Sequence, residues 1–203
     1  MTIKPILFST PMVRAISEKR KTQTRRTQGL KLINEDPELW VFDRRIGNQF
    51  IFKNKYNKNN QCFLIPKFLE GDILWVRETF RYAHHYGIDY EFVQYKDGST
   101  NTHCEIPDKD QILHDDKWKP SIFMPKAACR IFLEVINVKA ERLIDISWLD
   151  AVSEGCSGYR PTQDEPTHQF KRLWEFINGK ESWKENPWVW VYDFKRVEKP
   201  QNF

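Results

Sequence analysis

A cluster of cations near the N-terminus is the feature of this sequence that most clearly suggests chemistry. Five Lys and Arg residues occupy the eight positions 19–26, and Lys21 precedes Thr24 by three residues. A threonine hydroxyl becomes a nucleophile when a base removes its proton, and a lysine can be that base once burial and neighbouring cations lower its pKa. The pattern therefore suggests Lys21 as base and Thr24 as nucleophile. The alternative is a solvated basic loop after a helix, where cations also suit the helix dipole.

The spacing of Lys21 and Thr24 limits where they can meet. Residues three apart in a regular strand point to opposite faces, so the two side chains converge only at a helix end, a turn or a bulge. A helix is predicted over residues 10–19, because Ser9 or Thr10 followed by Pro11 is a helix start and the apolar residues that follow fall on one face. The cluster therefore lies just after a helix, where such convergence is possible.

Glu154 is the second candidate for a chemical role. Ser147 and Asp150 form a variant of the capping box, which predicts a short helix from Ser147 to just before Gly155. The residues expected to face inward are Trp148, Leu149 and Val152. Glu154 is then expected roughly opposite this stripe, in the last turn, where the helix dipole disfavours a carboxylate. It is either an exposed glutamate or a functional carboxylate placed against the Lys21 cluster.

A predicted strand over residues 73–80 carries the third candidate pair. Alternation places Trp75 and Arg77 on one face of this strand. Arg77 could pair with a carboxylate for structural reasons, or bind a phosphate or a base edge. Three further tryptophans are either core residues or platforms on which a base stacks: Trp118, Trp188 and Trp190. We take Arg20, Arg26, Trp75 and Arg77 as candidate substrate-binding residues.

Composition narrows the class of protein. The chain has 203 residues, 40% of them hydrophobic, with 14 Phe, 8 Trp and 7 Tyr, which is enough for the core of one domain. No apolar run approaches the length of a membrane span, and the first residues do not resemble a secretory signal, so we expect a cytoplasmic protein with no membrane partner. The net charge of +4 is compatible with an anionic ligand but does not require one.

Cysteine and histidine spacing argues against a metal centre. The four cysteines are widely separated, without a CxxC pair, and two of the five histidines, His84 and His85, are adjacent. Structural zinc sites usually have closely paired ligands, so we expect no metal, and we expect no cofactor. Without a signal peptide, the scattered thiols are expected to be reduced.

The strands and helices predicted along the chain, which must position these residues, indicate an α+β fold. Separated strand-like runs and a few short amphipathic helices suggest a small barrel or curled sheet in a single domain over residues 1–203. Strands are predicted near residues 6–8, 73–80, 129–138 and 188–194, and a further helix is predicted around residues 170–177. Residues 27–65 and 81–117 are interpreted as long insertions, the first irregular with strand-like patches at 39–42 and 49–52.

Taken together, these residues resemble the ASCH family, in particular its larger phage and prophage members. The similarity includes the runs RKTQTRR and GDILWVRET, and it lies in residues 6–16, 20–26, 71–79, 118–125, 143–147, 154–155 and 186–191. It covers most of the chain apart from the two insertions. The resemblance implies a PUA-like β-barrel with flanking short helices.

The resemblance also implies an activity. Many ASCH domains carry G-x-K-x-x-E-x-R, and the matching positions here are Lys19, Lys21, Thr24 and Arg26, so that Lys replaces Gly and Thr replaces Glu. The threonine form is similar to small ASCH enzymes that hydrolyse N4-acetylcytidine without a metal. In those enzymes the lysine is the base, the threonine the nucleophile, and a glutamate of a later helix assists proton transfer. These roles would fall on Lys21, Thr24 and Glu154.

Two functions are compatible with these residues. The first is an amidohydrolase acting on an acylated nucleobase or nucleoside, with Arg26 and Arg77 stabilising the oxyanion. The second is a non-catalytic module that binds RNA or a modified base, in which the basic segment contacts phosphates and aromatic rings stack on a base. The expected partner is a modified nucleoside or RNA in either case. A metal-assisted nuclease has no convincing ligand set.

Overall fold

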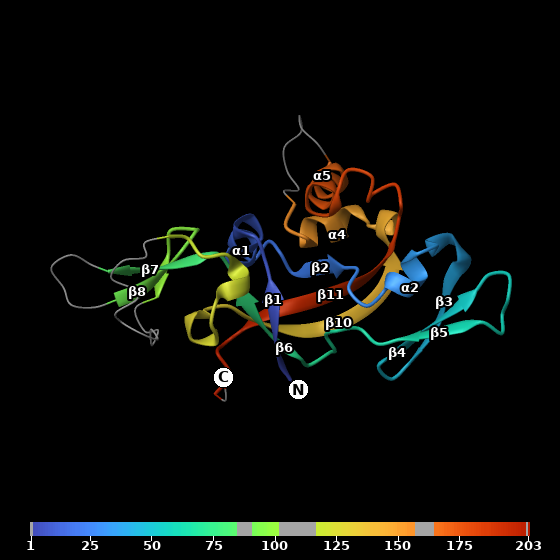
Figure 1. Cartoon of the computed structure of the whole chain (residues 1–203), viewed down its shortest axis with the longest axis horizontal. Helices are drawn as coiled ribbons and strands as arrows, with labels where there is room; N and C mark the ends of the chain where they lie inside the picture. The colour runs from blue at the N-terminus through green and yellow to red at the C-terminus, as the bar shows by residue number, and fades with distance from the viewer. Residues whose placement is uncertain (1, 85–90, 102–116, 157–164, 202) are drawn as a thin grey trace. The chain divides into compact units, whose positions relative to one another are not determined.

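The computed structural model shows a mixed α+β protein rich in strands (Figure 1). It describes residues 2–84, 91–101, 117–156, 165–201 and 203. The helices in these ranges are α1 (Thr10–Ser17), α2 (Lys31–Asn34), α4 (Trp148–Ser153) and α5 (Pro166–Asn178), with single 3-10 turns η1 (Pro37–Leu39), η2 (Ser121–Phe123), η3 (Lys126–Ala128) and η4 (Leu143–Asp145). None of the described helices is long and apolar enough to cross a membrane.

The strands form open sheets. Their bounds are β1 (Ile3–Leu7), β2 (Gln23–Arg26), β3 (Trp40–Ile46), β4 (Gln49–Asn54), β5 (Gln61–Leu64), β6 (Ile73–Arg77), β7 (Phe80–His84), β8 (Glu91–Tyr95), β9 (Thr100–Asn101), β10 (Phe132–Arg142) and β11 (Trp188–Val197). The predicted α+β class is confirmed at this level, whereas the closed PUA-like barrel stays a prediction.

The chain divides into two compact units, each built from separated segments. The first unit comprises Met1–Glu18, Asp72–Glu134 and Lys195–Phe203. The second comprises Lys19–Gly71 and Val135–Phe194. The prediction of one domain over the whole chain stays a prediction.

The first unit is organised around β6. The first four residues of this strand are apolar and buried, which suits a strand covered on both faces. It pairs with β1 in parallel, with Ile3 opposite Ile73, and with the first residues of β10 in antiparallel fashion, with Phe132 opposite Trp75. A second sheet has the order β7-β8-β9. The buried residues that join these strands in one core are Ile73, Trp75, Phe80, Tyr82, Val93, Tyr95, Met124, Ala128, Cys129 and Phe132.

The second unit carries most of the candidate site. Its strands follow the order β10-β11-β2, with β2 and β11 antiparallel and Thr24 opposite Tyr192. Helices α4 and α5 lie together beside β2 and β11 (Figure 1). Their core consists of Leu143, Ile146, Ala151, Phe170, Trp174, Val189 and Val191. The remaining sheet, β3-β4-β5, packs its aromatic face on β11 through Phe50 against Trp190 and Phe52 against Trp188.

Two local predictions have opposite outcomes. The capping box is present, because the Ser147 hydroxyl accepts a hydrogen bond from the Asp150 N–H and the Asp150 carboxylate accepts one from the Ser147 N–H. The predicted inward face of α4 is wrong, since Trp148 and Leu149 are 47% and 69% exposed. The buried positions are Ala151 and, just after the helix, Glu154. The buried face of α4 is therefore not the predicted apolar face, and the Glu154 carboxylate points inward.

Candidate active site

The end of α4 meets the free edge of β2 within the second unit. Lys21 and Glu154 form an isolated antiparallel bridge, and the Thr22 N–H donates to the Ser153 carbonyl at 2.8 Å. Strand β2 is the last in the order β10-β11-β2, so its outer edge is open to this pairing. Residues 133 positions apart in the chain are thereby joined through backbone and side chain.

The Lys21 ammonium is held inside the protein. Its Nζ donates to the Gln23 carbonyl at 2.8 Å, to the Glu154 carbonyl at 2.9 Å and to Glu154 Oε2 at 2.6 Å. The two side chains are 0% and 3% exposed. Three acceptors match the three N–H bonds of a protonated lysine. The structure thus shows Lys21 as a charged donor paired with a buried carboxylate.

The electrostatics of Lys21 favour loss of its proton more than in a surface lysine. Burial lowers the pKa of Lys21 below its ordinary value, and the charge of Arg26 adds to this effect. The Glu154 carboxylate opposes the shift through its charge and its hydrogen bond. The pKa of Lys21 is lowered overall, which is the direction a lysine base needs.

The other oxygen of Glu154 is bound by Arg25, a residue that the sequence alone did not single out. Arg25 Nη1 donates to Glu154 Oε1 at 3.1 Å and to Gln23 Oε1 at 2.6 Å. Its Nε and Nη2 donate to Glu141 Oε1 at 3.0 and 2.6 Å, and its guanidinium lies 5.6 Å from the centre of the Phe170 ring. Each oxygen of the Glu154 carboxylate therefore faces a different buried cation.

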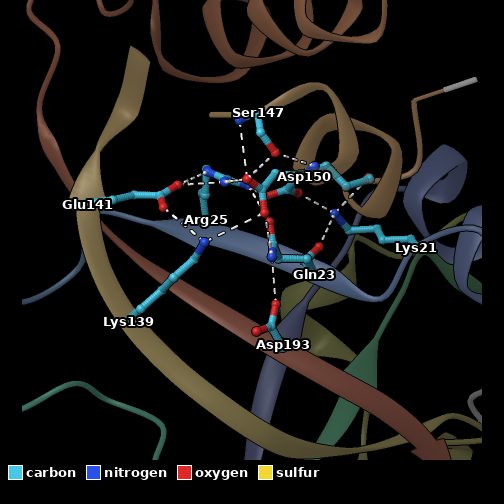
Figure 2. A network of polar contacts seen from close by, with 9 residues as sticks. Lys21, Gln23, Arg25, Lys139, Glu141, Ser147, Asp150 and Asp193 are labelled. Atoms are coloured by element: carbon cyan, nitrogen blue, oxygen red, sulfur yellow. Dashed lines mark hydrogen bonds and ion pairs between the residues drawn. The ribbon is translucent and has the colours of Figure 1, made fainter. Parts of the chain in front are cut away.

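The network continues from Arg25 toward the surface, as Figure 2 shows. Gln23 Nε2 donates to Asp193 Oδ1 at 2.6 Å and to Asp150 Oδ1 at 3.1 Å, and Lys139 bridges Glu141 and Asp150. Burial by itself would raise the pKa of Asp150. Hydrogen bonds from Ser147 and Gln23 and the charge of Lys139 outweigh burial and lower this pKa to about 2.

Thr24 and Arg26 lie on the face of β2 opposite to Gln23 and Arg25, as strand alternation requires. Thr24 is 2% exposed and pairs across the sheet with Tyr192. Burial lowers the pKa of Arg26, against the charges of Glu154 and Tyr192, but an arginine remains protonated. The Lys21 amine donates to the carbonyl of Gln23, in the strand that also carries Thr24.

The remaining candidates fall in different units. Arg20 donates from Nη1 to the Gly155 carbonyl at 2.8 Å, directly after Glu154. Trp75 and Arg77 belong to the first unit, where Arg77 lies 5.3 Å from the Trp75 ring and donates to the Ile122 carbonyl. Within the described part of the chain, Trp75 Nε1 and Arg77 Nε are buried without a hydrogen-bond partner. Their role in binding substrate stays a prediction.

Comparison with protein-family models, with curated proteins and with solved structures finds no match. Among the described residues, no group of three or more His, Cys, Asp and Glu side chains is placed to hold a metal ion.

Proposed function

We propose that this chain is an ASCH-type amidohydrolase with a PUA-like barrel that removes an acyl group from the exocyclic amine of a nucleobase, with N4-acetylcytidine as the model substrate. The observation that supports it is the buried pair of Lys21 and Glu154 at 2.6 Å, next to the strand that carries Thr24. Taking two charges out of water costs about as much as their attraction returns, so such a pair adds little stability. Buried, perturbed titratable groups are more typical of functional sites.

The proposed reaction assigns a step to each group. Thr24 Oγ1 attacks the acyl carbonyl while neutral Lys21 accepts the hydroxyl proton, and Arg26 stabilises the negative oxygen of the tetrahedral intermediate. The C–N bond then breaks, and the leaving amine of cytidine takes a proton that Glu154 relays from Lys21. Water hydrolyses the acetyl ester of Thr24, which releases acetate and restores the hydroxyl.

The experiment that tests this function follows cytidine and acetate released from N4-acetylcytidine by the purified full chain. We expect both products in equal amounts from the wild type, none above background from Thr24→Ala, and partial activity from Thr24→Ser. Thr22→Ala is the matched control, because Thr22 is exposed two residues away on the same segment. Full activity in Thr24→Ala would refute the assignment of the nucleophile.

A second candidate function is a non-catalytic module that binds a modified base or RNA. The observation that favours it is the set of three hydrogen bonds from Lys21, which is what a purely structural ammonium would make. This function predicts binding of N4-acetylcytidine or single-stranded RNA without turnover. For RNA, affinity measured across a salt series should fall steeply with salt concentration.

A further inference from the structure

Lys21 and Arg25 both donate to the Glu154 carboxylate, and of these two cations only Lys21 can work as a base. Oε2 is bound by Lys21 at 2.6 Å and Oε1 by Arg25 at 3.1 Å. An ammonium can lose its proton at an accessible pH, whereas a guanidinium in a protein cannot. The two contacts are therefore not equivalent, although both side chains are 0% exposed.

A lysine base creates an electrostatic problem in a buried pair. When Lys21 becomes neutral, its partner is left as a buried carboxylate that has lost a counter-ion, and an unpaired buried charge is strongly unfavourable. Lys21 would then keep its proton and could not act as a base. A second, permanent cation on the same carboxylate removes this penalty.

We propose that Arg25 is a positioning residue that keeps Glu154 paired whenever Lys21 is neutral, and so allows Lys21 to serve as the base. The inference deepens the proposed function and rests on it. Arg25 suits this role because Glu141 and Gln23 hold its other N–H groups, which fixes the guanidinium against Glu154 Oε1. Its neighbour Arg26 lies on the opposite face of β2.

Other charged or titratable groups near Lys21 do not replace Arg25. The charge of Arg26 acts on both Lys21 and Glu154, and Arg20 donates to the Gly155 carbonyl beside the pair. Cys156 also faces Lys21, but burial raises the pKa of its thiol to about 11, so it is neutral at working pH. Arg25 donates directly to the Glu154 oxygen that Lys21 does not bind, at 3.1 Å.

The test compares the pH dependence of kcat/KM for wild type, Arg25→Gln and Arg25→Lys. Without the guanidinium, the Glu154 carboxylate loses a cationic partner and holds the Lys21 proton more strongly, so Lys21 loses its proton at higher pH. We therefore expect the acidic limb of the Arg25→Gln profile to move upward by about one pH unit or more, with activity partly recovered at high pH. Arg25→Lys keeps the charge, and its limb should stay close to that of the wild type.

A matched control is available in the first unit. Arg130 is likewise a largely buried arginine paired with more than one carboxylate, here those of Glu78 and Asp97. Arg130→Gln should cost stability without moving the limb, whereas a purely structural role of Arg25 predicts the same behaviour for Arg25→Gln. If Arg25→Gln does not fold, Glu141→Gln decides. Glu141→Gln keeps Arg25 but removes the negative charge of Glu141 that partly balances the guanidinium. The positive charge near Lys21 is then less compensated, so the acidic limb of the pH profile should move to lower pH.

Titration of the Lys21 amine by nitrogen NMR, in protein labelled with ¹⁵N-lysine, separates this inference from the proposed function. A wild type that binds N4-acetylcytidine without turnover would end the proposed function, while the titration still reports on Arg25. We expect the Lys21 midpoint to rise in Arg25→Gln. An unchanged pH midpoint of the Lys21 titration in folded Arg25→Gln would overturn the inference. If that variant does not fold, an unchanged midpoint in folded Glu141→Gln would do so.

Discussion

Replacing Glu154 by glutamine should expose the energetics of the buried site most clearly. Glu154→Gln leaves Lys21 with two carbonyl acceptors and no counter-ion, in a position where its side chain is 0% exposed. Arg25 retains Glu141 and Gln23. Removing one partner of a buried ion pair typically costs about 3–5 kcal/mol, and we expect a loss of that size in the free energy of unfolding at pH 7.

The pH dependence of this loss has a defined sign. Burial already lowers the pKa of Lys21 in the folded protein, and removal of Glu154 takes away the main effect that opposes it. The unfolded chain then binds a proton that the folded variant does not, so the stability of Glu154→Gln should rise with pH relative to the wild type. The deficit at pH 7 should therefore shrink toward pH 10.

Urea unfolding followed by tryptophan fluorescence measures both effects. Glu134→Gln is the control, because Glu134 pairs with Lys195 at 3.0 Å near the surface and should cost less than about 1 kcal/mol. The double variant Lys21→Met/Glu154→Gln removes both charges and should be more stable than Glu154→Gln alone. A cost below about 1 kcal/mol for Glu154→Gln, independent of pH, would refute the reasoning.

Further predictions concern other parts of the chain. The low pKa of Asp150, about 2, means that its contribution to stability is present above about pH 4 and is lost as the pH falls toward 2, so the deficit of Asp150→Asn in urea unfolding should shrink over that range. The thiols of Cys129 and Cys156, with pKa values of about 12 and 11, should react with iodoacetamide at pH 8 much more slowly in the folded than in the unfolded protein, as mass spectrometry would show. Phe203→Ala removes a ring that contacts Trp75 and should cost about 2 kcal/mol by thermal unfolding, while a change within 0.5 kcal/mol would contradict its packing role.

Local signals in the sequence were sufficient for several elements. The capping box of Ser147 and Asp150 depends on two side chains three residues apart, and it forms as predicted. Helix α1 begins at Thr10 and buries Val13 and Ile16, as the apolar spacing indicates. The first predicted insertion is more regular than expected, because residues 27–65 contain α2 and β3 to β5. The strand-like patches predicted at residues 39–42 and 49–52 overlap β3 and β4, whereas α2 and β5 have four residues each, too few for a periodic pattern to stand out.

Contacts distant in the sequence explain what was missed. The apolar-stripe rule placed Trp148 and Leu149 inward on α4, but Glu154 takes the inward direction because Lys21 and Arg25, more than 120 positions away, compensate its charge. Arg25 carried no local signal of its own, since its acidic partners lie 116 and 129 residues further along. Alternation in a strand over residues 23–26 would have separated Arg25 from Arg26, but not identified its partners.

The most direct test of the central claim is a single end-point assay of wild-type protein with N4-acetylcytidine, in parallel with Thr24→Ala. We expect the wild type to convert the substrate to equal amounts of cytidine and acetate and Thr24→Ala to leave it intact. Intact substrate after prolonged incubation with folded wild type, or equal conversion by both proteins, would contradict the claim that Lys21, Thr24 and Glu154 form an amidohydrolase site.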